Sequence, residues 1–279
     1  MQKSDPKKDD TLNLLMIGNS GCYYYVEELY AIAKAAGVKM RVCNLYYSGC
    51  KLDQHWEWLR GNENKYEYFF TDENGKRSKK NVSLKTALKQ ENWDFISLQQ
   101  GSSVFFGDYD EGMQKTKGYA KNLFDYLKKE FPLSQFYWHQ TWAYQVGYDR
   151  SNGTVPDKAT QDALHEKLHR MSNFIALENN ASIIPAGDAW YLARQNPLIG
   201  DNLCARLGVK DDKGDNYHDG DIGGGQYLNA CTWFEVLTGK SCIGNSFRPD
   251  YDLSNEKIIE LQKAAHEAVA AIYGADFAK

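Results

Sequence analysis

Short, uninterrupted apolar runs recur along the chain. They occupy residues 12–17, 39–45, 93–98, 136–142 and 181–184. Runs of this length are typical of strands that are buried on both faces of a parallel sheet. Helical patterns lie between them, at residues 26–36, 115–130, 161–179 and 186–194. Because strands and helices alternate, the sequence predicts an α/β fold with a doubly wound parallel sheet of about five strands.

Two segments add to this alternation. Residues 66–70 and 77–82 flank the turn-forming sequence Asp-Glu-Asn-Gly, which predicts a small inserted β-hairpin that covers a site or decorates a sheet edge. Residues 255–273 have apolar positions at helical spacing after Ser254, and they predict a closing helix. We therefore expect a flexible tail at residues 1–11 and a single domain at residues 12–279.

Composition and charge exclude several classes of protein. The 279 residues are 42% hydrophobic and 25% charged, with a net charge of -4, as in ordinary soluble globular proteins. No apolar run reaches the roughly 18 residues of a membrane span. The first ten residues are polar and contain no intact signal peptide, but the sequence is compatible with a signal that has been processed or trimmed. A mildly acidic chain without a block of Lys and Arg is also a poor candidate for binding nucleic acid.

Cysteines and aromatic residues change the picture less. The six cysteines have no C-x-x-C spacing, so we expect no metal site and interpret most of them as small buried hydrophobic residues. Aromatic residues make up 14% of the chain, with 19 Tyr and 7 Trp. Their rings suit either core packing or stacking against sugars.

The first candidate for chemistry is Gly18-Asn19-Ser20-Gly21, between the first strand and the first helix. A serine there lies at the carboxyl end of a strand and near a helix N-terminus, which favours developing negative charge. Phosphate-loop and dinucleotide-binding motifs are absent, and G-x-S-x-G fails at Cys22. The alternative is that these residues only form a turn and a helix cap.

The second candidate is Asp215-Asn216-Tyr217-His218, in a loop that leads into a helix near residues 226–237. An acid three residues before a histidine can reach back to the imidazole and orient it as a general base for a serine. The alternatives are a polar, glycine-rich surface loop and a calcium loop, but the calcium pattern fails at Tyr217 and at Lys213.

Taken together, the two candidates resemble the SGNH (GDSL-like) hydrolases. Gly18-Asn19-Ser20 stands where the family has Gly-Asp-Ser, Tyr47-Ser48-Gly49 matches the second block, and Gln99-Gln100-Gly101-Ser102 replaces the usual Gly-x-Asn-Asp of the third. The resemblance implies a three-layer, flavodoxin-like fold and a catalytic triad of Ser20, His218 and Asp215. It also implies an oxyanion hole made by the N–H groups of Ser20 and Gly49 and the Gln100 amide, without any cofactor.

Further stretches, including Trp138-His139-Gln140-Thr141-Trp142, are similar to a bacterial SGNH branch of unassigned function. That branch implies export to the periplasm or cell surface and a role in glycan breakdown, with a cytoplasmic location still open. Asn19, His55, Trp56 and Trp142 are our candidates for substrate binding, and the two tryptophans alternatively pack in the core. We interpret His139, in an apolar run, as a buried histidine.

The functional hypothesis is a serine esterase that hydrolyses acyl esters, most simply O-acetyl esters, on a carbohydrate. Asn19 in place of Asp and the altered third block motivate an alternative, an inactive glycan-binding protein of the same fold. A lipid or acyl esterase is a further alternative, which predicts an apolar channel. The expected partner is a small-molecule or glycan ester, and the sequence indicates no oligomeric state.

Overall fold

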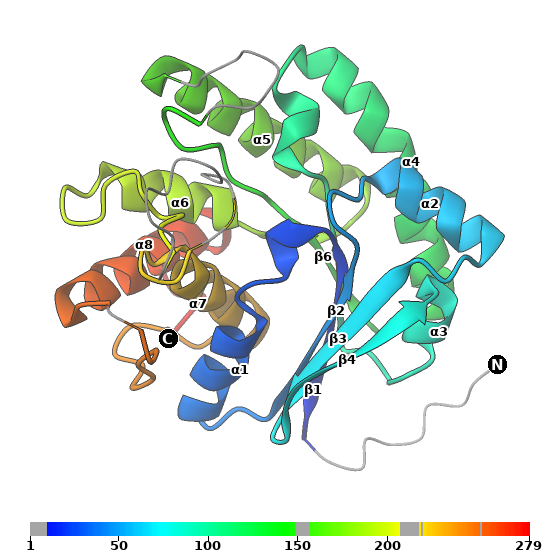
Figure 1. Cartoon of the computed structure of the whole chain (residues 1–279), viewed down its shortest axis with the longest axis horizontal. Coiled ribbons are helices and arrows are strands. Elements are labelled where there is room, and N and C mark those ends of the chain that lie inside the picture. The colour runs from blue at the N-terminus through cyan, green and yellow to red at the C-terminus, as the bar shows by residue number, and fades with distance from the viewer. Residues whose placement is uncertain (1–9, 149–156, 207–217, 219, 252) are drawn as a thin grey trace.

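The computed structural model describes residues 10–148, 157–206, 218, 220–251 and 253–279, and within them a seven-stranded sheet forms the centre (Figure 1). The strands are β1 (Leu12–Gly18), β2 (Met40–Tyr46), β3 (Tyr66–Asp72), β4 (Gly75–Val82), β5 (Phe95–Gln99), β6 (Gln135–His139) and β7 (Ser182–Ile184). Five strands are parallel, in the order β2-β1-β5-β6-β7. This flavodoxin-like order confirms the predicted doubly wound sheet.

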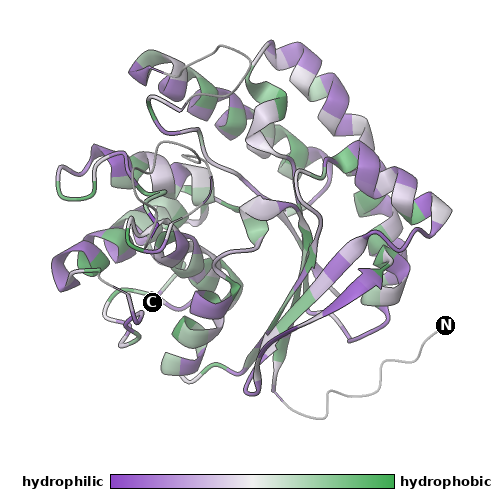
Figure 2. Ribbon diagram, viewed as in Figure 1, coloured by the Kyte–Doolittle hydropathy of each residue, from purple (hydrophilic) through white to green (hydrophobic). Residues whose placement is uncertain are grey.

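The predicted hairpin is β3 and β4, and it joins the main sheet. β3 pairs antiparallel with β2, and β4 pairs antiparallel with β3, so the sheet has seven strands and not about five. β4 is the edge strand, and Figure 2 shows it as largely hydrophilic beside the more hydrophobic inner strands. Its sequence, Gly-Lys-Arg-Ser-Lys-Lys-Asn-Val, places cationic side chains along an edge that would otherwise invite pairing with another chain.

Helices cover both faces of the sheet, which confirms the three layers (Figure 1). One face carries α1 (Val26–Ala35), α6 (Ala186–Gln195), α7 (Gly225–Thr238) and α8 (Asn255–Tyr273). The other carries α2 (Leu52–Gly61), α3 (Leu84–Leu88), α4 (Tyr109–Glu130) and α5 (Lys158–Glu178). α2 and α3 were not among the predicted helices, whereas the closing helix α8 has the predicted bounds.

The alternation of side chains along β1 divides the interior into two cores. Leu14 and Met16 point to the core beneath α1, α6, α7 and α8, whereas Leu15 and Ile17 point to the core beneath α2–α5. Successive side chains of a strand face opposite sides of a sheet, so a continuous apolar run supplies both cores at once. This explains why the strands lack a polar alternation.

Two sequence expectations concern the chain as a whole. All six cysteines are buried, as predicted. None of the helices in the described ranges is long and apolar enough to span a membrane. Residues 1–9 of the predicted tail lie outside the described residues, and the division into a tail and one domain stays a prediction.

Candidate active site

The loop after β1 forms a tight turn that holds Ser20 at the carboxyl edge of the sheet. Residues 20–22 make one turn of 3₁₀ helix, and the Asn19 side chain caps it by accepting a hydrogen bond from Gly21 N at 3.0 Å. Ser20 is 6% exposed. A Cβ on Gly18 would lie 2.7 Å from Cγ of Gln99, so glycine is required for the strand to enter this turn.

The Asn19 side chain links the loop after β1 to the loop after β2 and to the end of β5 by hydrogen bonds. Its Nδ2 donates to Cys50 O at 2.9 Å, and its Oδ1 accepts from Gln99 Nε2 at 2.5 Å. Both polar atoms are therefore engaged, and Asn19 is only 4% exposed. This corrects the prediction that Asn19 binds substrate, because its side chain builds the turn that carries Ser20.

The second block lies next to this turn. Gly49 has a φ of +65°, a left-handed conformation that glycine adopts without strain, and nothing lies within 4 Å of the position of an added Cβ. The Asn19 bond to Cys50 O holds the loop against the Ser20 turn. The placement is compatible with a role for Gly49 N–H in an oxyanion hole, which stays a prediction.

The two glutamines of the third block point in different directions. The Gln100 amide donates to Thr116 Oγ1 at 3.3 Å and accepts from Leu52 N at 3.4 Å, so it faces α2 and α4. One of its two N–H donors is thus engaged away from Ser20, and the oxyanion role of Gln100 stays a prediction. Gln99, one residue earlier, is the side chain that reaches the nucleophile turn.

Gln99 also contacts His139, at the end of β6. The Gln99 Oε1 to His139 Nδ1 distance is 3.0 Å, and since Gln99 donates to Asn19 through Nε2, its Oε1 accepts the imidazole proton from Nδ1. His139 is buried, as predicted, and burial lowers its pKa to about 3. Among the described residues, its Nε2 has no hydrogen-bond partner. His139 is therefore a neutral support for Gln99.

His218 contacts the loop that follows the Ser20 turn, and its predicted role as the base stays a prediction. Its ring contacts the ring of Tyr24 edge to face, with centroids 5.2 Å apart, and Tyr24 follows Ser20 by four residues. Asp215 lies outside the described residues, so its predicted role stays a prediction. The fold thus brings one late residue of the predicted triad to the first loop.

The glycines after His218 let the backbone of this segment pack closely against residues 202–205. Gly220 N donates to Leu203 O at 3.1 Å, and Gly223 N donates to Ala205 O at 3.0 Å. A Cβ on Gly220 would lie 2.1 Å from Ala205 O, and one on Gly223 would lie 2.4 Å from Asn202 O. The described part of this segment is therefore packed against residues 202–205, which the reading as a plain surface loop did not anticipate.

Two predicted substrate-binding residues belong to the core. Trp142 is fully buried and stacks on Trp190, with centroids 4.4 Å apart and an angle of 9° between the rings. His55 is also fully buried, stacks on Tyr66, and has its Nδ1 2.8 Å from the Tyr66 hydroxyl. Neither can contact a sugar, so both predictions are wrong. Trp56 is half-buried against the core beneath α2, and its role stays a prediction.

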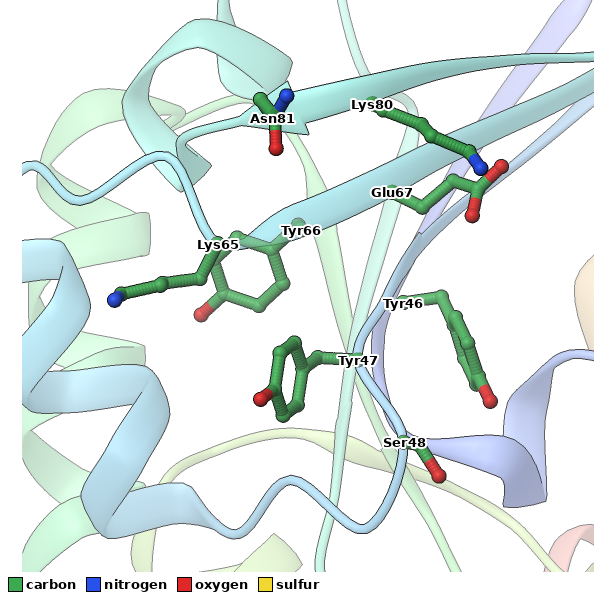
Figure 3. A pocket seen from close by; sticks show the side chains of 8 residues that line it. All are labelled: Tyr46, Tyr47, Ser48, Lys65, Tyr66, Glu67, Lys80 and Asn81. Atoms are coloured by element: carbon green, nitrogen blue, oxygen red, sulfur yellow. The ribbon is translucent and has the colours of Figure 1, made fainter.

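A pocket of about 380 Å³ opens beside the second block (Figure 3). Its lining residues are Tyr46, Tyr47, Ser48, Lys65, Tyr66, Glu67, Lys80 and Asn81. They come from the end of β2, the start of β3 and the end of β4. The predicted hairpin therefore contributes to a cavity at the same edge of the sheet as Ser20.

In the described ranges, no group of three or more His, Cys, Asp or Glu side chains is arranged to hold a metal ion.

Glu28 is a buried acid close to the His218 loop. Burial raises its pKa from 4.5 to about 7, and the negative charges of Glu27 and Asp221 act in the same direction. Among the described residues, its Oε2 has no hydrogen-bond partner. Asp221, whose charge acts on Glu28, follows His218 by three residues, so Glu28 lies near the segment that carries the candidate base.

Glu28 is expected to make folding less favourable as the pH rises. The carboxyl ionises near pH 4.5 in the unfolded chain but only near pH 7 in the folded one, so stability is lost between these values. Relative to wild type, Glu28→Gln should gain up to about 3 kcal/mol in the free energy of unfolding from pH 4 to pH 8. Urea unfolding across this range measures the gain, with the exposed Glu178→Gln as control. Parallel curves for wild type and Glu28→Gln would contradict it.

The fold agrees with the resemblance noted in the sequence. The flavodoxin-like strand order, the serine turn after β1 and the glycine loop after β2 are the features that a resemblance to the SGNH hydrolases implies. The sequence also matches, over residues 13–268, the family described as DUF4886, a domain of unknown function. The chain belongs to the DUF4886 family.

Solved structures agree with this assignment. The crystal structure of a DUF4886 family protein from Bacteroides uniformis ATCC 8492 is 29% identical, has a TM-score of 0.81, and matches over 97% of this chain and 98% of that chain. A protein described as GDSL-like lipase, from Parabacteroides merdae ATCC 43184, is 15% identical with a TM-score of 0.52, over 82% of this chain and 96% of that one. The second likeness shows the fold alone. No curated protein matches the chain.

Proposed function

We propose that this protein is a serine esterase that hydrolyses acyl esters of a carbohydrate, most simply O-acetyl esters. The observation that supports the proposal is the contact of the His218 ring with the ring of Tyr24, four residues after Ser20 in the loop that follows β1. In a doubly wound sheet the carboxyl edge is where ligands bind, at the point where the strand order changes direction. Ser20 follows β1 and Gln99 ends β5, the two strands on either side of that point.

The chemistry requires three acts. Ser20 Oγ attacks the ester carbonyl while His218 takes its proton, and the N–H groups of Ser20 and Gly49 stabilise the oxyanion. His218 then protonates the sugar oxygen, which leaves as an alcohol. Water, activated by the same histidine, attacks the acyl-enzyme and releases acetate and Ser20, and Asp215 would orient the imidazole throughout.

The pocket beside Ser48 supports a carbohydrate over a long acyl chain. It is lined by three tyrosines together with lysine, glutamate, asparagine and serine. Hydroxyl groups of a sugar can bond such polar groups, and the apolar face of a sugar ring can stack on tyrosine. A fatty acyl chain instead needs an apolar channel.

An inactive glycan-binding protein is the second candidate, and the third block favours it. The amides of Gln99 and Gln100 are both engaged within the protein, to Asn19 and Thr116. If neither amide offers its second N–H to the ester, the oxyanion rests on two backbone donors, and losing a donor costs about 10²–10³-fold in kcat in enzymes of this kind. This candidate predicts glycan binding without turnover.

An acetate-release screen over acetylated oligosaccharides separates the two candidates. Wild type should release acetate, and Ser20→Ala should lower the rate at least about 1,000-fold while folding normally. Ser182→Ala is the matched control, because Ser182 starts β7 at the opposite edge of the sheet. Undiminished turnover by Ser20→Ala would refute the assignment, and binding of the oligosaccharides without turnover by wild type would support the glycan-binding candidate.

A further inference from the structure

The pocket of about 380 Å³ lies next to two loops of the candidate active site. Ser48 lines it and immediately precedes Gly49, the expected oxyanion donor. Tyr46, also in the lining, packs its ring against Tyr23, with centroids 4.8 Å apart, and Tyr23 ends the turn that holds Ser20. A ligand in the pocket therefore lies beside the loops that would hold the reacting ester.

A β-bulge in the hairpin shapes this pocket. β3 and β4 pair Tyr68 with Lys79, and next Tyr66 with Val82. Between these pairs, β3 contributes Glu67 alone, whereas β4 contributes two residues, 80 and 81. Bulges of this kind redirect side chains and are frequent next to active sites.

All three bulge residues line the pocket. Asn81 has a φ of +56°, in the left-handed region that few residues other than glycine adopt. This conformation is what allows Lys80 and Asn81 to face one opening together with Glu67.

A rigid aromatic ring forms one wall. Tyr47 is 41% exposed, and its ring rests on that of Trp58 with centroids 4.8 Å apart and an angle of 72°. Trp58 in turn contacts Tyr66, which is buried, at 5.4 Å. Figure 3 shows the Tyr47 ring next to that of Tyr66. An exposed ring held by a half-buried tryptophan, itself packed on a buried tyrosine, offers a preorganised face for stacking.

The charges that line the pocket offset one another. Lys65 forms an ion pair with Glu63 at 3.5 Å, and Figure 3 shows the Lys80 and Glu67 side chains extending toward one another across the hairpin. The lining thus offers both hydrogen-bond donors and an acceptor but little net charge. This composition suits an uncharged, hydroxyl-rich ligand, because a charge of either sign on a ligand would meet a like charge as well as an opposite one in the lining.

We propose that this pocket binds an uncharged sugar unit adjoining the acylated unit of the substrate. The Tyr47 ring stacks on the sugar, and Glu67, Lys80 and Asn81 bond its hydroxyls. The proposal rests on the proposed esterase function, since it names the part of the substrate that the enzyme recognises. It assigns the inserted hairpin a role in specificity.

The test compares a small ester with acetylated oligosaccharides. Tyr47→Ala should raise KM for acetylated xylotriose about 10-fold, a much larger change than in its KM for p-nitrophenyl acetate, because only the oligosaccharide extends into the pocket. Tyr47→Phe should keep most of the affinity, and Lys80→Gln should raise KM severalfold. Lys79→Gln is the matched control, since Lys79 contacts Gln90 on the other side of the hairpin and should change nothing.

The outcomes separate the pocket from the catalytic proposal. Equal KM values for wild type and Tyr47→Ala would overturn the pocket assignment, and a lower KM for a matched substrate with a uronate in the adjoining position would overturn its preference for uncharged sugars. If wild type hydrolyses neither ester, the esterase proposal fails, and calorimetry with unacetylated xylotriose then tests the pocket. Binding that Tyr47→Ala weakens about 10-fold would support the pocket, and no binding would overturn it.

Discussion

Replacing His218 by alanine is expected to lower kcat/KM for acetate esters at least about 1,000-fold, as much as the loss of Ser20. The reason is that serine and its base act as one unit, so that removing either abolishes nucleophilic attack. Steady-state assays with p-nitrophenyl acetate measure the effect. Asp215→Asn should be milder, since loss of an orienting group leaves part of the base function.

A second histidine provides the control for this experiment. His169 lies on α5, where its Nδ1 contacts Asp188 Oδ1 at 3.0 Å, on an element that supplies nothing to the site. His169→Ala should retain the wild-type kcat/KM within about twofold. Equal activity of His218→Ala and wild type would show that another group acts as the base.

Substituting Gly220 by alanine should lower the esterase activity by shifting the backbone of the loop that carries His218. Its Cβ would meet Ala205 O at 2.1 Å, so the loop that carries His218 must shift. We expect about 1–3 kcal/mol of lost stability and a fall of about 100-fold in kcat/KM, because displacing a catalytic group by about 1 Å has effects of this size. Urea unfolding and ester hydrolysis measure the two effects in one preparation.

Gly118→Ala is the matched control for Gly220. Gly118 lies in the exposed middle of α4, with nothing within 4 Å of an added Cβ, so alanine should stabilise the helix by up to about 1 kcal/mol without changing activity. Wild-type activity in Gly220→Ala would contradict the view that close backbone packing positions the His218 loop.

Much of the fold was readable because the buried parallel strands are continuous apolar runs. The five predicted runs correspond to β1, β2, β5, β6 and β7, within a few residues at their ends. α2 was missed because its inward positions include His55, a residue that reads as polar but is fully buried against Tyr66. Only the tertiary partner on β3 makes that helix face recognisable.

The site was less predictable because it depends on register. Gln99 and Gln100 are neighbours, and neighbouring side chains at a strand end point in different directions, so the sequence could not show which of them reaches Asn19. Trp142 was placed at a strand end, but β6 ends at His139 and the chain then carries the ring onto Trp190. The serine turn needed no such information, because it follows directly from the end of β1.

Covalent labelling of Ser20 tests the central claim most directly. Wild-type protein is treated with a fluorophosphonate, digested, and examined by mass spectrometry for the modified residue. We expect stoichiometric labelling of Ser20 in the wild-type protein, no labelling at this position in Ser20→Ala, and strongly slowed labelling of Ser20 in His218→Ala. Labelling of a different residue, or of Ser20 at the same rate in His218→Ala, would contradict the assignment of Ser20 as a nucleophile activated by His218.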